Sequence, residues 1–81
     1  MLAKPNDYGV VFILMNTIEA GKVIRRRRMS LHIDQSALSE IAGIAVHTLS
    51  NIEAGRGNPT VATLERVLNV LGMELRIQIK E

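Results

Sequence analysis

The sequence predicts a mainly α-helical domain of four to five helices, with a short strand near each terminus. Apolar residues recur three and four positions apart through much of the chain, as they do on the buried face of a helix. Asn, Asp and Thr stand where helices would begin, and Gly43 and Gly72 stand where helices would end. Residues 73–80 alternate instead between apolar and polar side chains, which is typical of a half-buried strand.

Size and composition limit the classes of protein. A chain of 81 residues forms one domain, close to the size at which a single core is only just sufficient, so a dimer would add stability. It has no cysteine, and His32 and His47 are isolated, so we expect no metal, no cofactor and a reducing, cytoplasmic location. The apolar run at residues 10–15 is far shorter than the ~20 residues of a membrane helix, and we expect neither export nor insertion.

Positive charge is concentrated in one segment. The net charge is only +2, yet half of the ten basic residues fall within the seven positions 22–28. Such a cluster can be a solvated helix face, but clustered cations without acidic partners are more often held where phosphate neutralises them. The charge distribution therefore favours nucleic acid as a partner.

The N-terminal part is expected to lead into the first helix. Residues 1–15 form a polar lead-in and the apolar run, which we interpret as a strand. Six residues cannot distinguish a buried strand from an early start of the first helix, so that alternative stays open. The helix itself should begin at Asn16 or Thr17 and continue to about Ser30. Its expected core contacts, with those of the turn that follows, are Ala20, Ile24, the stem of Arg28, Leu31 and Ile33.

Two short helices hinged at Gly43 form the centre of the prediction. Asp34 caps the first of them. Glycine adopts positive φ at no steric cost, so Gly43 can end this helix and turn the chain while Ile44 packs into the angle. This is the helix-turn-helix layout. The apolar stripes are Leu38, Ile41 and Ala42 in the first helix and Leu49 and Ile52 in the second.

The last helix follows a loop at residues 54–60 that is rich in glycine, asparagine and proline. Thr60 is its expected N-cap and Gly72 its C-terminal glycine. A lone strand at each end of the domain would leave backbone groups unpaired, so we expect residues 73–81 to pair with the N-terminal strand or across a dimer. The apolar face of the helix is Val61, Leu64, Val67, Leu68 and Leu71.

Five segments occur in the order and spacing of the lambda-repressor-like (XRE) DNA-binding domains. They are Ile-Arg-Arg-Arg-Arg at 24–28, Leu-His-Ile-Asp-Gln at 31–35, Leu-Ser-Glu-Ile-Ala-Gly-Ile-Ala at 38–45, Thr-Leu-Ser-Asn-Ile-Glu-Ala-Gly at 48–55 and Pro-Thr at 59–60. The chain resembles this family over residues 21–75, and the pattern after Gly72 resembles the HipB-type antitoxin branch. The resemblance implies a helix-turn-helix DNA-binding domain at 16–72, with a dimerisation strand at 73–81.

Three positions depart from the family pattern. Ser39 replaces the usual alanine and Asp34 the usual threonine. Ala45 replaces the serine or threonine that normally caps the recognition helix, and alanine cannot cap, which costs ~1 kcal/mol. We therefore expect this helix, at residues 45–53, to start a residue late or to fray in the absence of DNA.

The resemblance implies a transcriptional repressor whose recognition helix lies in the major groove. Val46, His47 and Asn51, with Ser50 at the edge, are the implied base-reading residues; Asn51 can bond adenine through both amide atoms. Arg28 and Glu53 are the implied structural ion pair. For His47, Ser36 and Asn58 a purely structural or solvated role stays open. The expected phosphate contacts are Lys22, Arg25, Arg26, Gln35, Ser36, Arg56, Asn58 and Thr60.

Other classes of function fit less well. The chain has no paired carboxylates, no nucleophile with a base and no complete phosphate-binding glycine loop, so we expect no enzyme. A protein-interaction module would not need outward Val46, His47 and Asn51 beside cations. The remaining alternative is an antitoxin that binds a toxin and represses its own operon. The partners expected are a two-fold symmetric DNA duplex, a second copy of the chain and, in the last case, a toxin protein.

Overall fold

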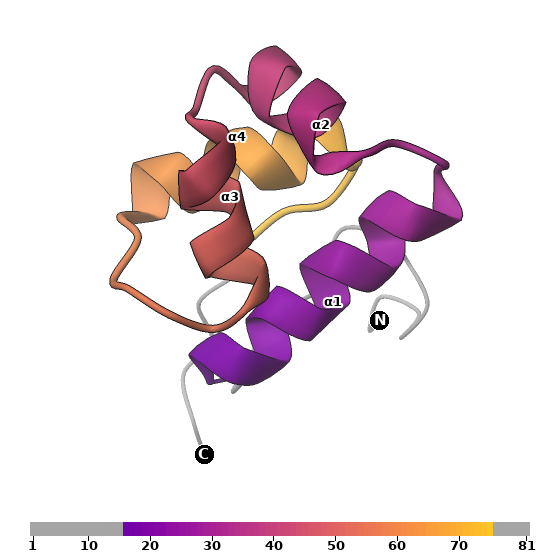
Figure 1. Ribbon diagram of the computed structural model, residues 1–81. Coiled ribbons are helices and arrows are strands. Elements are labelled where there is room, and N and C mark those ends of the chain that lie inside the picture. Colours follow the sequence, from indigo (N-terminus) through magenta and orange to yellow (C-terminus); the bar gives the residue numbers. More distant parts are fainter. Residues whose placement is uncertain (1–15, 76–81) are drawn as a thin grey trace, which may run out of the picture.

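The computed structural model describes residues 16–75, which form a bundle of four helices (Figure 1). The mainly helical prediction is confirmed. α3 packs against α1 and α2, and α2 packs against α4. In Figure 1, α1 crosses the bundle on one side, while α2 and α4 lie together on the other. The helices are α1 (Thr17–Ser30), α2 (Gln35–Ala42), α3 (Val46–Glu53) and α4 (Val61–Val70).

Neither terminal strand nor a fifth helix occurs within residues 16–75. The strand predicted at residues 10–15 lies outside the described residues. Residues 73–75 of the predicted C-terminal strand have no strand structure, and residues 76–81 are outside the described part. A strand needs a partner for its backbone groups, and the described helices offer residues 73–75 no strand edge.

The helix starts follow the predicted caps. Asn16 and Glu19 form a capping box, in which the Glu19 N–H donates to Asn16 Oδ1 at 2.9 Å and the Asn16 N–H donates to Glu19 Oε1 at 3.3 Å. Asp34 Oδ1 accepts from the Ala37 N–H at 2.7 Å, and Thr60 Oγ1 accepts from the Thr63 N–H at 3.1 Å. All three caps are confirmed. Gly43 also ends α2 with φ 73°, as predicted.

The core lies where the four helices meet. Ile33, Ile44 and Leu64 are half-buried and pack against it, in agreement with the predictions made for them. Each helix contributes at least one residue, so the core couples α3 to the whole bundle. The buried apolar residues are Ile24, Leu38, Ala42, Leu49, Ile52, Val67, Leu68 and Leu71.

Three apolar residues predicted to face the core are exposed. Ile41 is 65% exposed because α2 buries the side that carries Leu38 and Ala42, and the adjacent buried position is Ser39. The Ser39 hydroxyl is satisfied by donating to the Ser36 carbonyl at 2.9 Å. Val61 is 56% exposed in the first turn of α4. Leu31, 40% exposed, follows the end of α1, where His32 with φ 58° turns the chain away.

Gly21 brings α1 unusually close to α3, a feature that the sequence patterns did not reveal. A Cβ atom at this buried position would collide with the Ile52 carbonyl oxygen and lie 2.7 Å from the Glu53 carbonyl oxygen. Only glycine permits so close an approach of two backbones. Gly21 therefore sets how α3 sits on α1.

Candidate nucleic-acid interface

The helix α3 begins without a side-chain cap. Ala45 occupies the N-cap position and makes no side-chain hydrogen bond, as predicted. The Thr48 and Leu49 N–H groups nevertheless donate to the Ala45 carbonyl at 3.1 and 3.2 Å. The helix thus starts at Val46, and the expected late start is wrong because the backbone bonds to Ala45 form without a cap.

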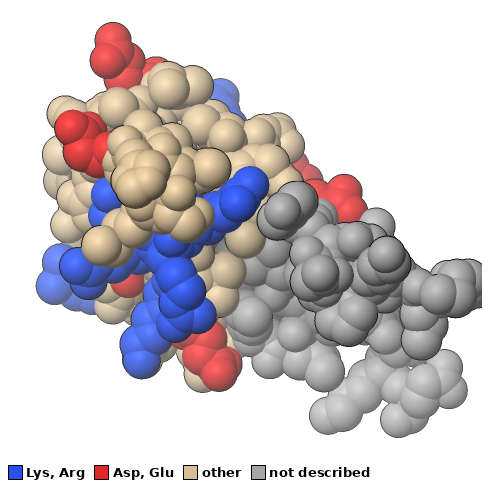
Figure 2. All heavy atoms as spheres, turned by 90° about the vertical axis from the view of Figure 1, so that its right-hand side faces the viewer, with Lys and Arg blue, Asp and Glu red and all other residues tan. Residues whose placement is uncertain are grey.

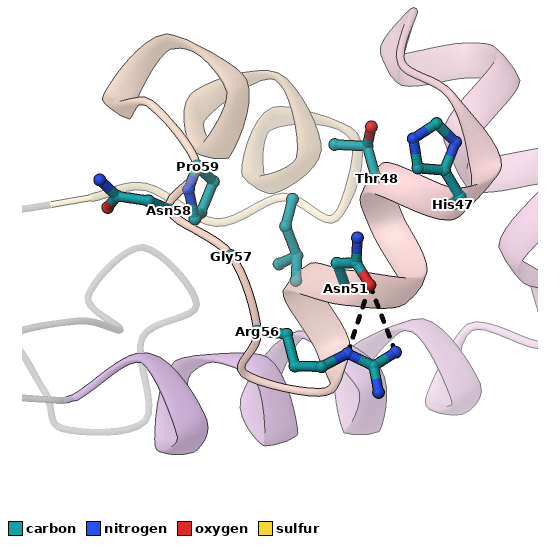
Figure 3. A pocket seen from close by; sticks show the side chains of 8 residues that line it. His47, Thr48, Asn51, Arg56, Gly57, Asn58 and Pro59 are labelled. Atoms are coloured by element: carbon teal, nitrogen blue, oxygen red, sulfur yellow. Dashed lines mark hydrogen bonds between the residues drawn. The ribbon is translucent and has the colours of Figure 1, made fainter.

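The outward residues of α3 face two separate hollows. His47 and Asn51, four positions apart, line an open hollow of about 200 Å³ together with Arg56 and Asn58 of the following loop (Figure 3). Thr48 lines the same hollow, although the sequence had not singled it out. Val46 is 44% exposed at the start of the helix.

Ser50 lines a second hollow, apart from the other predicted base-reading residues. This space of about 420 Å³ is lined by Ser50, Arg25 and Gln35, with Arg28 and Glu53 beside them. It brings residues from three different helices, α1, α2 and α3, together. The two hollows therefore place polar and cationic groups on both sides of α3.

Asn51 and Arg56 are in direct contact, which no pattern in the sequence predicted. Asn51 Oδ1 accepts from Arg56 Nε at 3.3 Å and from Arg56 Nη2 at 3.2 Å (Figure 3). The predicted base-reading residue and one of the predicted phosphate-binding residues thus form a single polar unit at the edge of the hollow.

Arg28 and Glu53 form the bidentate pair implied by the family resemblance. Arg28 Nε donates to Glu53 Oε2 at 2.7 Å, Nη2 donates to Oε1 at 3.0 Å, and Nη1 donates to the Ile33 carbonyl at 2.8 Å. The two side chains are 11% and 3% exposed. The hydrogen bond that Arg28 donates to Glu53 raises the pKa of Arg28, outweighing the opposite effect of burial. The pair joins α1 to the C-terminal end of α3.

Gln35 and Thr60 were predicted to contact phosphate, but both side chains have partners within the fold. Gln35 Nε2 donates to Glu53 Oε1 at 3.0 Å, which uses one of its two amide hydrogens. The Thr60 hydroxyl donates to Thr63 Oγ1 at 2.9 Å, and its single hydrogen is thereby used in the cap of α4. A phosphate bond from the Thr60 hydroxyl would have to replace that contact.

The basic cluster of α1 divides into an outward and an inward part. Lys22, Arg25 and Arg26 are exposed and border a hollow of about 260 Å³ with Met29. Arg27 is turned toward the C-terminal end of α4, where its Nε donates to the carbonyl of Leu71, the residue after the helix, at 2.9 Å. Figure 2 shows Lys and Arg side chains gathered on one face of the molecule. Three of the clustered cations therefore face solvent.

The remaining predicted phosphate contacts lie at the surface. Ser36 is exposed in the first turn of α2, and Asn58 is exposed in the loop before α4.

In residues 16–75 no helix is long and apolar enough to cross a membrane. The same residues contain no cluster of three or more His, Cys, Asp or Glu side chains that could hold a metal ion.

A model of the helix-turn-helix family matches residues 24–78, which is most of the chain. The chain belongs to the helix-turn-helix family. The matched segment includes the C-terminal part of α1 and the whole of α2, α3 and α4. It thus contains both hollows beside α3 and most of the α1 cations.

Relatives and solved structures agree with this family. The chain is 30% identical over 57 residues to the ImmF control region 10 kDa protein of Bacillus phage phi105, covering 70% of this chain and 63% of that protein. The restriction-modification controller protein C.AhdI from Aeromonas hydrophila matches with a TM-score of 0.68 and 19% identity, over 72% of this chain and 88% of that one. A chain of the SinR protein/SinI protein complex matches with a TM-score of 0.63 and 36% identity, over 68% of this chain and 54% of that one.

Proposed function

We propose that this helix-turn-helix protein is a sequence-specific DNA-binding transcriptional regulator that acts as a repressor. The observation that carries the proposal is α3, whose exposed side presents His47 and Asn51 to one hollow and Ser50 to another, between cations of α1 and of the following loop. Only the major groove of DNA is wide enough for a helix and offers a distinct pattern of donors and acceptors for each base pair. α3 therefore fits as the recognition helix.

The comparisons support a role in control. One relative belongs by its name to a phage control region, and a structural neighbour is named a restriction-modification controller. The chain spans less than two thirds of the phage relative and about half of the chain from the SinR–SinI complex. The proposed activity thus concerns the segment shared with them.

Two kinds of contact are proposed. Val46, His47, Ser50 and Asn51 read base edges, because they lie along the outward part of α3. Cations and polar groups around them contact phosphate, which fixes the position on the duplex without reading its sequence. These phosphate contacts are Lys22, Arg25, Arg26, Gln35, Ser36, Arg56, Asn58 and Thr60.

A homodimer on a two-fold symmetric site is part of the proposal. One domain of this kind makes few base contacts, and two half-sites ~34 Å apart double them.

We assign DNA binding to residues 16–72, dimerisation to residues 73–81 and a lead-in to residues 1–15, with a cytoplasmic location. The likeness to a chain of the SinR–SinI complex supports binding of a further protein partner in addition to DNA. None of the three relatives named above is described as an antitoxin, so we do not pursue the HipB-type toxin partner.

The test is selection from a pool of randomised duplexes, followed by binding measurements with competitor DNA. We expect enrichment of one motif with two-fold symmetry. Val46→Glu should abolish binding, since it places a negative charge on the exposed start of α3, and should leave the helix content unchanged. Recovery of no motif, with Val46→Glu binding as well as the original chain, would exclude sequence-specific recognition by α3.

A further inference from the structure

The contact between Asn51 and Arg56 arises from the way in which α3 ends. The Gly55 N–H donates to the Ile52 carbonyl at 3.0 Å, and the Arg56 N–H donates to the Asn51 carbonyl at 2.8 Å. Gly55 has φ 74°, so this is a Schellman motif, which ends a helix with a left-handed glycine. The motif brings the residue after the glycine, Arg56, beside Asn51, five positions earlier. This pair is frequently apolar; here it is Arg56 and Asn51.

The chemistry of the pair determines which way the Asn51 amide faces. An arginine side chain has donors and no acceptor, so it can face only the amide oxygen. Arg56 Nε and Nη2 both donate to Asn51 Oδ1, at 3.3 and 3.2 Å. A carbonyl oxygen has two lone pairs, and these two bonds use both. Asn51 is thus left with its Nδ2 hydrogens, which are donors.

An amide with an engaged oxygen cannot make the usual contact with adenine. Adenine presents an acceptor, N7, and a donor, the N6 amino group, so a bidentate contact needs both the nitrogen and the oxygen of the amide. Guanine presents two acceptors in the same groove, N7 and O6. The Nδ2 group of Asn51 and the remaining N–H groups of Arg56 are donors, and donors match guanine.

We infer that Asn51 and Arg56 form one recognition unit that presents only donors to the major groove and selects guanine over adenine at one position. The inference rests on the proposed function and replaces the adenine contact expected from the sequence. Besides offering its own N–H groups, Arg56 positions Asn51 in this unit, because it holds the Asn51 oxygen away from the base. Both residues line the open hollow beside α3, so the unit lies where a base edge would enter (Figure 3).

The experiment compares the full chain with Arg56→Ala, Arg56→Lys and Asn51→Ala by selection from randomised duplexes and by titration of the selected sites. The original chain should prefer guanine about tenfold over adenine at one position. Asn51→Ala should lose preference there. Arg56→Ala should change the preferred base from guanine to adenine, because the freed amide can rotate and offer both groups. Arg25→Ala is the charge-matched control, and it should weaken all sequences alike without changing the preferred base.

Arg56→Lys separates positioning from attraction to phosphate. Lysine keeps the charge but lacks the fork of N–H groups that engages one oxygen twice. If Arg56 served only phosphate, lysine would restore affinity and neither Arg56 variant would change the preferred base. That result, or selection of adenine by the original chain at the Asn51 position, would overturn the recognition unit while leaving sequence-specific binding intact. Absence of any enriched motif would instead refute the proposed function, and the unit with it.

Discussion

The two ends of α3 are held in opposite ways. At the C-terminal end, Glu53 is buried and accepts hydrogen bonds from Arg28 and Gln35. At the N-terminal end, Ala45 provides no side-chain cap, and Val46 and His47 are exposed. The buried end therefore fixes where the helix lies on α1, while the open end leaves side chains and backbone N–H groups accessible to a ligand. A helix anchored at one end can present the other without a rigid cap.

Breaking the anchored end should have the largest effect. Arg28→Met leaves Glu53 buried without its ion-pair partner, which should lower the free energy of unfolding by ~3 to 5 kcal/mol. Arg26→Met, on the exposed side of the same helix, is the matched control and should change it by less than about 0.5 kcal/mol. Urea denaturation measures both. A similar loss for the two variants would show that Arg28 does not anchor α3.

The stability that the Arg28–Glu53 pair contributes at the anchored end should not depend on pH around neutrality. A group whose pKa is raised by folding, such as Arg28, contributes stability that is fully present below the pKa of that group in the unfolded chain. This stability is lost only as the pH rises above that value. The difference between Arg28→Met and the original chain should therefore stay constant from about pH 7 to 9, because arginine remains charged there.

The close contact between the α1 and α3 backbones at Gly21 leaves no room for an added methyl group. Gly21→Ala should lower the free energy of unfolding by about 1 to 3 kcal/mol, because the added Cβ would overlap the Ile52 carbonyl. Helix propensity alone would predict a gain of ~1 kcal/mol for the same change. Lys22→Ala, at the exposed neighbouring position, is the control and should be close to neutral in thermal denaturation. A stabilised Gly21→Ala protein would contradict the close approach.

The open end should gain from a cap. Ala45→Ser supplies an oxygen for the first-turn N–H groups and should raise the free energy of unfolding by ~1 kcal/mol, with slower amide exchange at Thr48. Ala54→Ser, at the other end of the same helix, is the control and should give no such gain. An equal effect of the two serines would mean that the ends of α3 do not differ in this respect.

The smallest expected change concerns salt. Arg25→Ala should lower the slope of log affinity against log salt by about one, since one phosphate contact is lost. Arg27→Ala is the control on the same helix, because the Arg27 side chain is turned to the Leu71 carbonyl. Titrations over a series of salt concentrations measure both slopes. Equal reductions would indicate that the orientation of these neighbouring arginines does not decide which of them meets DNA.

Local signals in the sequence carried most of the architecture. Asn16, Asp34 and Thr60 were recognisable as caps because a short polar side chain before an apolar period satisfies free N–H groups wherever it occurs. Gly43 was recognisable as a turn because a left-handed residue favours glycine. Periodicity was less decisive at the edge of a stripe, and it assigned Ile41 and Val61 to the core although both are exposed.

What the sequence determined by itself was the helical class, the positions of the caps and turns, and the presence of a cation cluster before a helix-turn-helix. All of these depend on residues within about one helical turn of each other. Only the tertiary structure decided which side chains meet: that Arg27 turns to Leu71 and that Gln35 binds Glu53. It also decided how closely α1 approaches α3 at Gly21. Such contacts depend on how helices cross in space, and a pattern read along one helix does not contain that geometry.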